Sequence, residues 1–229
     1  MTYPYTRRSP RWHWLCLLLS ALLLLSACDL PPTPPQPVPG ALRWRVQIAD
    51  KQNATPVFVA NVLVYLVGAD HAIYALDAAT GRQRWRTQLG AAGAFVSAVA
   101  DGAVYIMGIT RAPSLTYMIY ALDATTGTKR WRVQSRQSPS VDATVANGLV
   151  YFGDWSSPVF ALDAATGAQR WQAQDSANLY AAPAVVNGTV YDVSRVDNGS
   201  VVALDATTGA LRWQAQAGSG GRGSLRWLI

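Results

Sequence analysis

Four near-identical copies of one short motif constrain this chain more than any other feature of its sequence. The motif reads Ala-Leu-Asp-Ala-x-Thr-Gly-x-x-Arg-Trp, and its copies span residues 75–85, 121–131, 161–171 and 203–213. Their tryptophans are 46, 40 and 42 residues apart. A period of about 40 to 45 residues is typical of propeller blades, each built from four strands. The repeat therefore predicts an all-β propeller.

A second motif with the same period lies upstream of each copy and supplies the other strands. It is a short turn followed by Val-Tyr, with the tyrosines at 65, 105, 151 and 191. Asn-Gly and Asp-Gly are strong hairpin signals because both residues tolerate positive φ. No stretch of the expected mature chain combines helical periodicity with caps, so each period predicts four strands and no helix.

The repeated aspartate, glycine and tryptophan are interpreted as structural residues. The aspartate can accept hydrogen bonds from backbone amides two residues on, and the glycine can adopt a left-handed conformation without steric cost. Burying a tryptophan removes about 150–250 Å² from water, which favours packing between blades. The residues concerned are Asp77, Gly81, Trp85, Asp123, Gly127, Trp131, Asp163, Gly167, Trp171, Asp205, Gly209 and Trp213.

These repeats resemble the tryptophan-docking repeats of pyrroloquinoline-quinone-type β-propellers across residues 41–217. The resemblance implies a propeller of four-stranded blades. That superfamily includes quinoprotein dehydrogenases, and it also includes non-enzymatic lipoproteins similar in class to the outer-membrane assembly propeller of the Bam complex. A shared fold does not choose between these functions.

The N-terminus predicts export and lipid anchoring. Residues 1–27 combine a basic start with an apolar run from Trp14 to Leu25, which is short for a membrane span and typical of a signal peptide. Leu25-Ser26-Ala27-Cys28 resembles a bacterial lipobox, which would make Cys28 the lipidated first residue of the mature protein. Residues 28–40 form a proline-rich tether, which is expected to be extended. The predicted location is extracytoplasmic, on a bacterial membrane.

Composition argues against several function classes. Glutamate is absent, and Cys28 is the only cysteine expected in the mature chain. The resemblance implies that a quinone enzyme would hold calcium with a glutamate, an asparagine and an aspartate, and many such enzymes carry a vicinal disulfide. We therefore expect no cofactor, no metal site and no catalytic residue. The mature chain has sixteen basic and thirteen acidic residues without a basic run, so a nucleic-acid partner is not expected either.

Candidate binding residues are sought where the repeats differ in length. The distance from the Val-Tyr tyrosine to the repeat tryptophan is 20, 26, 20 and 22 residues in the four blades. Insertions concentrated on one face of a repeat protein often mark its binding face. The longest variable loop is expected from Met107 to Met118. The residues singled out in such loops are Arg111, Tyr117, Asp154, Trp155, Arg195 and Asp197.

The repeats do not complete a ring of the expected size. Ala41-Leu-Arg-Trp44 is the end of a repeat without its beginning, and residues 218–229 are expected to form a glycine-rich irregular tail. The sequence thus predicts about four complete blades plus one stray strand, in an incomplete, open propeller; a small closed ring is the alternative. Unpartnered end blades would favour self-association.

The leading functional hypothesis is a non-catalytic, membrane-anchored scaffold that binds envelope proteins or supports envelope assembly. One alternative is a quinone-dependent enzyme, which the missing glutamate disfavours. Another is a sensor of an envelope ligand such as a glycan, for which Trp155 is the candidate contact because it lies outside the repeat pattern.

Overall fold

The computed structural model describes residues 40–48, 57–111, 114–135, 139–154, 158–173, 182–194, 200–216 and 226–227. The chain falls into two units, Met1–Leu42 and Arg43–Ile229, and all described strands belong to the second unit. Every regular element in these ranges is a β-strand, which confirms the all-β prediction. Within the same ranges, no helix of membrane-spanning length and hydrophobicity occurs.

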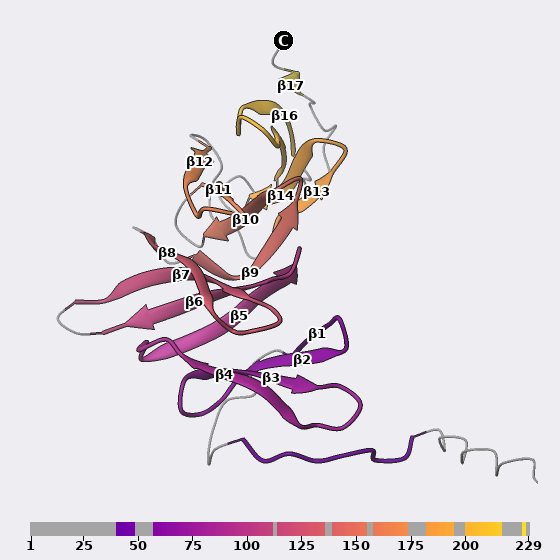
Figure 1. Cartoon of the computed structure of the whole chain (residues 1–229). Helices are drawn as coiled ribbons and strands as arrows, with labels where there is room; N and C mark the ends of the chain where they lie inside the picture. Colours follow the sequence, from indigo (N-terminus) through magenta and orange to yellow (C-terminus); the bar gives the residue numbers. More distant parts are fainter. Residues whose placement is uncertain are drawn as a thin grey trace, which may run out of the picture. The chain divides into compact units, whose positions relative to one another are not determined.

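The strands form four antiparallel sheets, each made of strands consecutive in the sequence (Figure 1). Blade 1 contains β1 (Phe58–Ala60), β2 (Leu63–Val67), β3 (Ala72–Asp77) and β4 (Gln83–Gln88). Blade 2 contains β5 (Gly93–Ala100), β6 (Ala103–Thr110), β7 (Thr116–Asp123) and β8 (Lys129–Ser135). Blade 3 contains β9 (Pro139–Ala146), β10 (Leu149–Asp154), β11 (Phe160–Asp163) and β12 (Gln169–Gln172). Blade 4 contains β13 (Ala184–Val186), β14 (Thr189–Ser194), β15 (Ser200–Asp205) and β16 (Leu211–Gln216).

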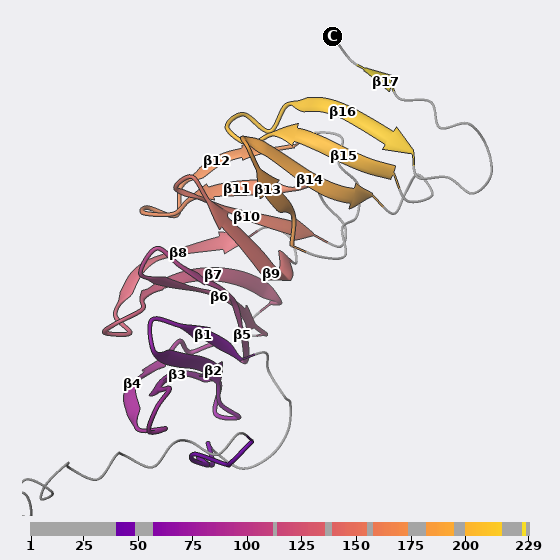
Figure 2. The same cartoon turned by 90° about the vertical axis from the view of Figure 1, so that its right-hand side faces the viewer.

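Neighbouring blades pack in chain order, with the apolar core divided among the interfaces between them (Figure 2). Tyr65 of blade 1 packs among residues of blade 2, Tyr105 of blade 2 among residues of blade 3, and Tyr151 of blade 3 among residues of blade 4. All three tyrosines are buried. The described strands form an open propeller of four blades, as the repeats predict.

The ends of the repeat array differ in detail from expectation. The described residues 40–48 contain no strand, although Trp44 still packs against blade 1. A short strand, β17 (Arg226–Trp227), pairs with β16 as a fifth strand of the last sheet. The tail expected to be irregular therefore has two residues in the sheet, because the edge of β16 offers free backbone groups for pairing.

Each blade's first two strands are joined by a tight turn whose two central residues have positive φ. The second of these is Gly102, Gly148 or Gly188 in blades 2 to 4, with φ of 69°, 74° and 70°. In blade 1 it is Val62, with φ of 60°. A β-branched residue is strained in this conformation, because its Cβ approaches the following carbonyl oxygen.

Replacing Val62 with glycine should therefore stabilise the protein. We expect Val62→Gly to raise the free energy of unfolding by about 1 kcal/mol, measured by urea denaturation. The converse variant Gly148→Val, at the equivalent turn of blade 3, should lower it by a similar amount. Equal midpoints for Val62→Gly and the parent chain would contradict this account of the turn.

The Asp-Ala-x-Thr-Gly segment forms the same hydrogen-bonded turn between the third and fourth strands of every blade. In blade 3, Asp163 Oδ1 accepts hydrogen bonds from the amides of Ala165 and Thr166 at 3.1 and 2.9 Å and from Thr166 Oγ1 at 2.9 Å. Arg170 Nη2 donates to Asp163 Oδ2 at 2.7 Å. The arginine and these donors lower the pKa of the Asp163 carboxyl to about 2. The repeated Arg is thus explained as the partner of the repeated Asp.

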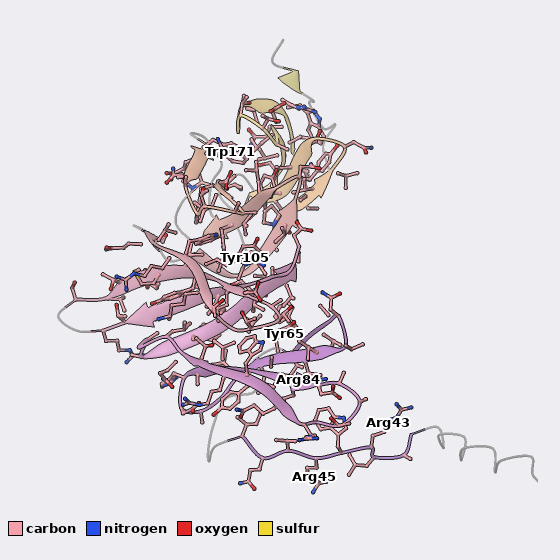
Figure 3. All side chains as sticks on the ribbon, in the orientation of Figure 1. Arg43, Arg45, Tyr65, Arg84, Tyr105 and Trp171 are labelled. Atoms are coloured by element: carbon pink, nitrogen blue, oxygen red, sulfur yellow. The ribbon has the colours of Figure 1, made fainter. Side chains whose placement is uncertain are left out.

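The repeat tryptophans dock onto this turn in the next blade. The indole Nε1 of Trp85 donates to Ala124 O at 2.9 Å, and Trp131 and Trp171 donate to Ala164 O and Ala206 O at 3.0 Å. The hydroxyl of Tyr65 donates to the same carbonyl as Trp85, at 3.2 Å. Tyr65, Tyr105 and Trp171 accordingly lie inside the stack of sheets (Figure 3).

The turn glycine is required for two separate reasons. Gly127 has φ of 73°, and a Cβ built on it would lie 2.6 Å from the ring of Trp85. The corresponding approach is 2.7 Å at Gly167 and 2.4 Å at Gly209. Only a residue without Cβ combines the left-handed backbone with this contact.

Two alanine substitutions can separate strain from steric clash. Gly127→Ala should lower the free energy of unfolding by about 2–3 kcal/mol, because it adds overpacking to backbone strain. Gly188→Ala should lower it by only about 1 kcal/mol. Gly188 is the matched control, since its φ is 70° but its Cβ would have no neighbour within 4 Å. Equal losses in urea denaturation would show that the tryptophan contact is unimportant.

Candidate binding face

The connections in which the repeats differ lie at one end of the strands in every blade. Because antiparallel strands reverse direction, the connection from second to third strand lies at the same end as the link to the next blade. In blade 1 these are residues 68–71 and 89–92. The link is held to the next blade by the amide of Ala92, which donates to Ile109 O at 2.7 Å. We call the surface at this end of the strands the connection face.

The long loop expected in blade 2 is mostly strand. Blade 2 has six more residues than blade 1 between its Val-Tyr tyrosine and its tryptophan. Three of them lengthen β6 relative to β2, two lengthen β7 relative to β3, and one enters the connection. The prediction of a loop from Met107 to Met118 is therefore wrong. The alternation of β-formers on both sides of Arg111 lets the hairpin continue pairing as far as Thr110 and Thr116.

The structure places two of the six candidate binding residues with their side chains. Arg111 follows β6 directly and is exposed on the connection face. Tyr117 lies within β7, paired with Ile109 and Ser135, and is half-buried, so its assignment to a loop is corrected. Asp154 is the last residue of β10, again a strand position. Trp155, Arg195, Asp197 and the lipidation candidate Cys28 lie outside the described residues.

Arg111 borders a cavity between blades 1 and 2 on the connection face. The cavity has a volume of about 290 Å³. Its walls come from the 68–71 connection, the link between the blades and the ends of β5 and β6. The lining residues are Val67, Gly68, Ala69, His71, Ala92, Gly93, Ala94, Phe95, Ile109 and Arg111.

The chemistry of this cavity favours binding. Val67, Phe95 and Ile109 give it apolar walls, and Arg111 adds a permanent positive charge at its border. Such a site suits an apolar side chain flanked by a carboxylate, as in an acidic peptide segment.

A larger cavity of about 400 Å³ lies between blades 2 and 3, and neither Arg111 nor Tyr117 borders it. It opens between their third and fourth strands, with Val133, Phe160 and Gln172 among its lining residues. Among the described residues, no group of three or more His, Cys, Asp or Glu side chains is arranged to hold a metal ion.

A polar cluster beside the first cavity was not foreseen. Asp70 Oδ2 accepts hydrogen bonds from Tyr74 OH at 2.8 Å and from Arg86 Nη2 at 2.6 Å. Burial alone would raise the pKa of Asp70, but hydrogen bonds from Arg86, Tyr74 and the Ala72 amide lower it to about 2. Gln88 Nε2 donates to Asp70 O at 2.9 Å. The cluster holds the 68–71 connection in place, and the repeat pattern gives no sign of it because Asp70 lies outside the repeated motifs.

Asp192 is a second residue that the repeat pattern conceals. It follows Tyr191 in β14, at the position held by Ile106 and Phe152 in blades 2 and 3, which are fully buried. In blade 3, Phe152 stacks on Phe160 with ring centroids 5.4 Å apart. Asp192 is 8% exposed, and its Oδ2 has no hydrogen-bond partner in the described part of the chain. Burial raises its pKa to about 7, although the Val193 amide donates to its Oδ1 at 2.7 Å and opposes the shift.

The titration of Asp192 should make stability fall as the pH rises. The folded protein holds this proton up to about pH 7, whereas the unfolded chain releases it near the ordinary aspartate pKa of 3.8. The free energy of unfolding should therefore decrease between about pH 4 and pH 7 and level off above. Asp192→Asn should remove this slope in thermal melts and be more stable than the parent at pH 8.

Asp101→Asn provides the matched control, because Asp101 is exposed and asparagine occupies the corresponding turn position in the other blades. It should keep the slope of the parent chain. The turn aspartates affect stability in a different pH range, since their lowered pKa values change the free energy of unfolding only below about pH 4. A flat profile for the parent between pH 4 and pH 7 would contradict the assignment to Asp192.

Comparison with known proteins identifies the family of this fold. The family described as outer membrane protein assembly factor BamB matches residues 36–112 and 116–226. No curated protein sequence matches the chain.

Two kinds of solved structure share the fold. BamB from Moraxella catarrhalis superimposes with a TM-score of 0.52 at 23% identity, covering 78% of this chain and 56% of that protein. The quinohemoprotein alcohol dehydrogenase ADHIIG from Pseudomonas putida HK5 gives 0.56 at 21% identity, covering 76% of this chain and 35% of the enzyme. The corresponding enzyme from Comamonas testosteroni gives 0.52 at 17% identity, covering 71% of this chain and 34% of the enzyme.

These identities show a shared fold, and the chain spans little more than half the length of the BamB structure. The family match, in contrast, extends over most of the sequence, including all four repeats. The chain therefore belongs to the family of the outer membrane protein assembly factor BamB, with the β-propeller of pyrroloquinoline-quinone-type repeats.

Proposed function

We propose that this protein is a non-catalytic scaffold that binds other proteins of the bacterial envelope through its connection face. The observation that carries the proposal is the cavity bordered by Arg111, which combines apolar walls with a positive charge at the edge where the repeats differ. Membership in a family named for an assembly factor supports the same role.

The proposal includes lipid anchoring to a bacterial membrane on its extracytoplasmic side. Its support is the sequence of residues 1–40, with a signal peptide, Cys28 as the acceptor and a proline-rich tether.

A quinone-dependent enzyme is the less supported candidate. The fold is shared with quinohemoprotein alcohol dehydrogenases. However, the chain contains no glutamate, and the carboxylates of Asp70, Asp77, Asp123, Asp163 and Asp205 are each paired with an arginine. A carboxylate that is paired with an arginine would have to lose that partner before it could bind calcium. The glycan-sensor alternative depends on Trp155, which lies outside the described residues.

Site-specific photo-crosslinking tests the scaffold role. A photoreactive amino acid is placed at Arg111 in the full chain, expressed in a Gram-negative host, and the same substitution at Thr125 serves as the control. Thr125 is also exposed but lies in the turn at the opposite end of the strands of blade 2. We expect discrete adducts with envelope proteins from position 111 and none from position 125. Equal labelling from both positions, or none from either, would count against the proposal.

Anchoring is tested separately in the same cells. Cys28→Ala should abolish incorporation of labelled fatty acid and move the protein out of the membrane fraction. The control Cys16→Ala should change neither result, because Cys16 lies within the expected leader.

A further inference from the structure

The cavity of about 400 Å³ between blades 2 and 3 lies where a serine replaces a buried leucine of the preceding interface. Leu89, four residues after Trp85, is 7% exposed and packs in the core between blades 1 and 2. Its counterpart, four residues after Trp131, is Ser135, which lines the cavity. Because serine is much smaller than leucine, this exchange contributes to the open space between blades 2 and 3.

A backbone carbonyl at this cavity lacks the donor that its counterpart has. Thr87 Oγ1 donates to Gly127 O at 2.7 Å between blades 1 and 2. Val133 takes the place of Thr87 at the next interface, where a Cβ built on Gly167 would lie 3.1 Å from Val133 Cγ1. Valine has no hydroxyl, and among the described residues no donor reaches Gly167 O. A ligand that fills the cavity would have to supply a donor, because an acceptor enclosed without one costs free energy.

The cavity combines two facing apolar walls with polar groups around them. The walls are formed by Ile119 and Val133 of blade 2 and by Phe160 and Leu162 of blade 3. On β12, Gln172 is paired with Phe160 and Gln169 with Leu162, and Gln169 Nε2 donates to Gln172 Oε1 at 3.5 Å. Both glutamines are exposed, so solvent reaches this side of the cavity. Every described residue that lines the cavity is uncharged.

These features favour an uncharged sugar ring as the ligand. A sugar ring carries apolar C–H groups on its two faces and hydroxyls around its rim, and each hydroxyl both donates and accepts. An ionic ligand would lose its water without meeting an opposite charge, and a purely apolar ligand would leave Gly167 O unpaired. The volume lies within the range of about 300–1,000 Å³ that is typical of ligand pockets.

We propose that the cavity between blades 2 and 3 binds a neutral saccharide. In this site a ligand hydroxyl donates to Gly167 O, the amides of Gln169 and Gln172 bind neighbouring hydroxyls, and the ring packs between Val133 and Phe160. The site shares no lining residue with the cavity on the connection face. The proposal is therefore independent of the scaffold role.

Saturation-transfer-difference NMR of the full chain, in a detergent without a sugar head group, tests the proposal. The probes are three neutral disaccharides, maltose, cellobiose and N,N′-diacetylchitobiose, and the anionic digalacturonic acid. We expect a saturable signal from at least one neutral disaccharide and none from digalacturonic acid, because no described cation lines the cavity. The proposal is overturned if none of the three neutral disaccharides gives a saturable signal, or if digalacturonic acid binds equally well.

Two substitutions that copy the interface between blades 1 and 2 should close the site while the chain stays folded. Ser135→Leu introduces the side chain present at Leu89 and should weaken disaccharide binding at least tenfold, because it fills the cavity. Val133→Thr gives Gly167 O an internal donor, as Thr87 does in the preceding blade, and should weaken binding about three- to tenfold. A urea midpoint close to that of the parent distinguishes loss of the site from loss of the fold.

Arg111→Ala is the matched control, since it changes only the cavity on the connection face, and it should bind the disaccharide like the parent. Undiminished binding by folded Ser135→Leu and Val133→Thr would place the saccharide elsewhere and overturn the proposal. The N-acetylated, C-amidated peptide Ser-Thr-Val-Leu-Thr-Ser is the competing probe. If this peptide binds in a manner that Ser135→Leu abolishes, while no disaccharide binds, the cavity is a peptide site and the proposal is wrong.

Discussion

The contact of a tryptophan with the aspartate turn of the next repeat is the interaction on which the rest of this structure depends. A single four-stranded blade has two apolar faces and cannot bury both alone. The indole covers one face, and its Nε1 donates to a backbone carbonyl of the next blade, so this buried donor is satisfied where water is excluded. Burial and hydrogen bonding are thus satisfied by the same residue.

The other repeated residues follow from that contact. The aspartate holds the turn by accepting three local hydrogen bonds, and the arginine neutralises its charge. The glycine permits the backbone conformation and leaves room for the ring. The motif is consequently a packing unit, and its carboxylates are engaged in structure. Residues that differ between blades, such as Arg111 and Asp192, are where binding or titration can occur.

The sequence predictions were correct for the repeated residues and incomplete for residues that differ between blades. The blades and their order could be predicted because the repeat period and the turn residues act locally. The prediction of a long loop in blade 2 was wrong, since strand pairing beyond Met107 depends on a partner strand that the spacing of the motifs does not reveal. Asp70 and Asp192 were missed because their importance comes from neighbours: Arg86 and Tyr74 for the first, and a buried face for the second.

The sequence by itself determined the four-blade repeat, the turns between strands and the residues that join one blade to the next, because these depend on contacts that recur at a fixed period. Only the tertiary structure decided which surfaces are available. It brought the 68–71 connection, β5 and Arg111 around one cavity, and it buried Asp192. Cavities and exposure are properties of neighbouring sheets, and a repeat read along one chain does not contain them.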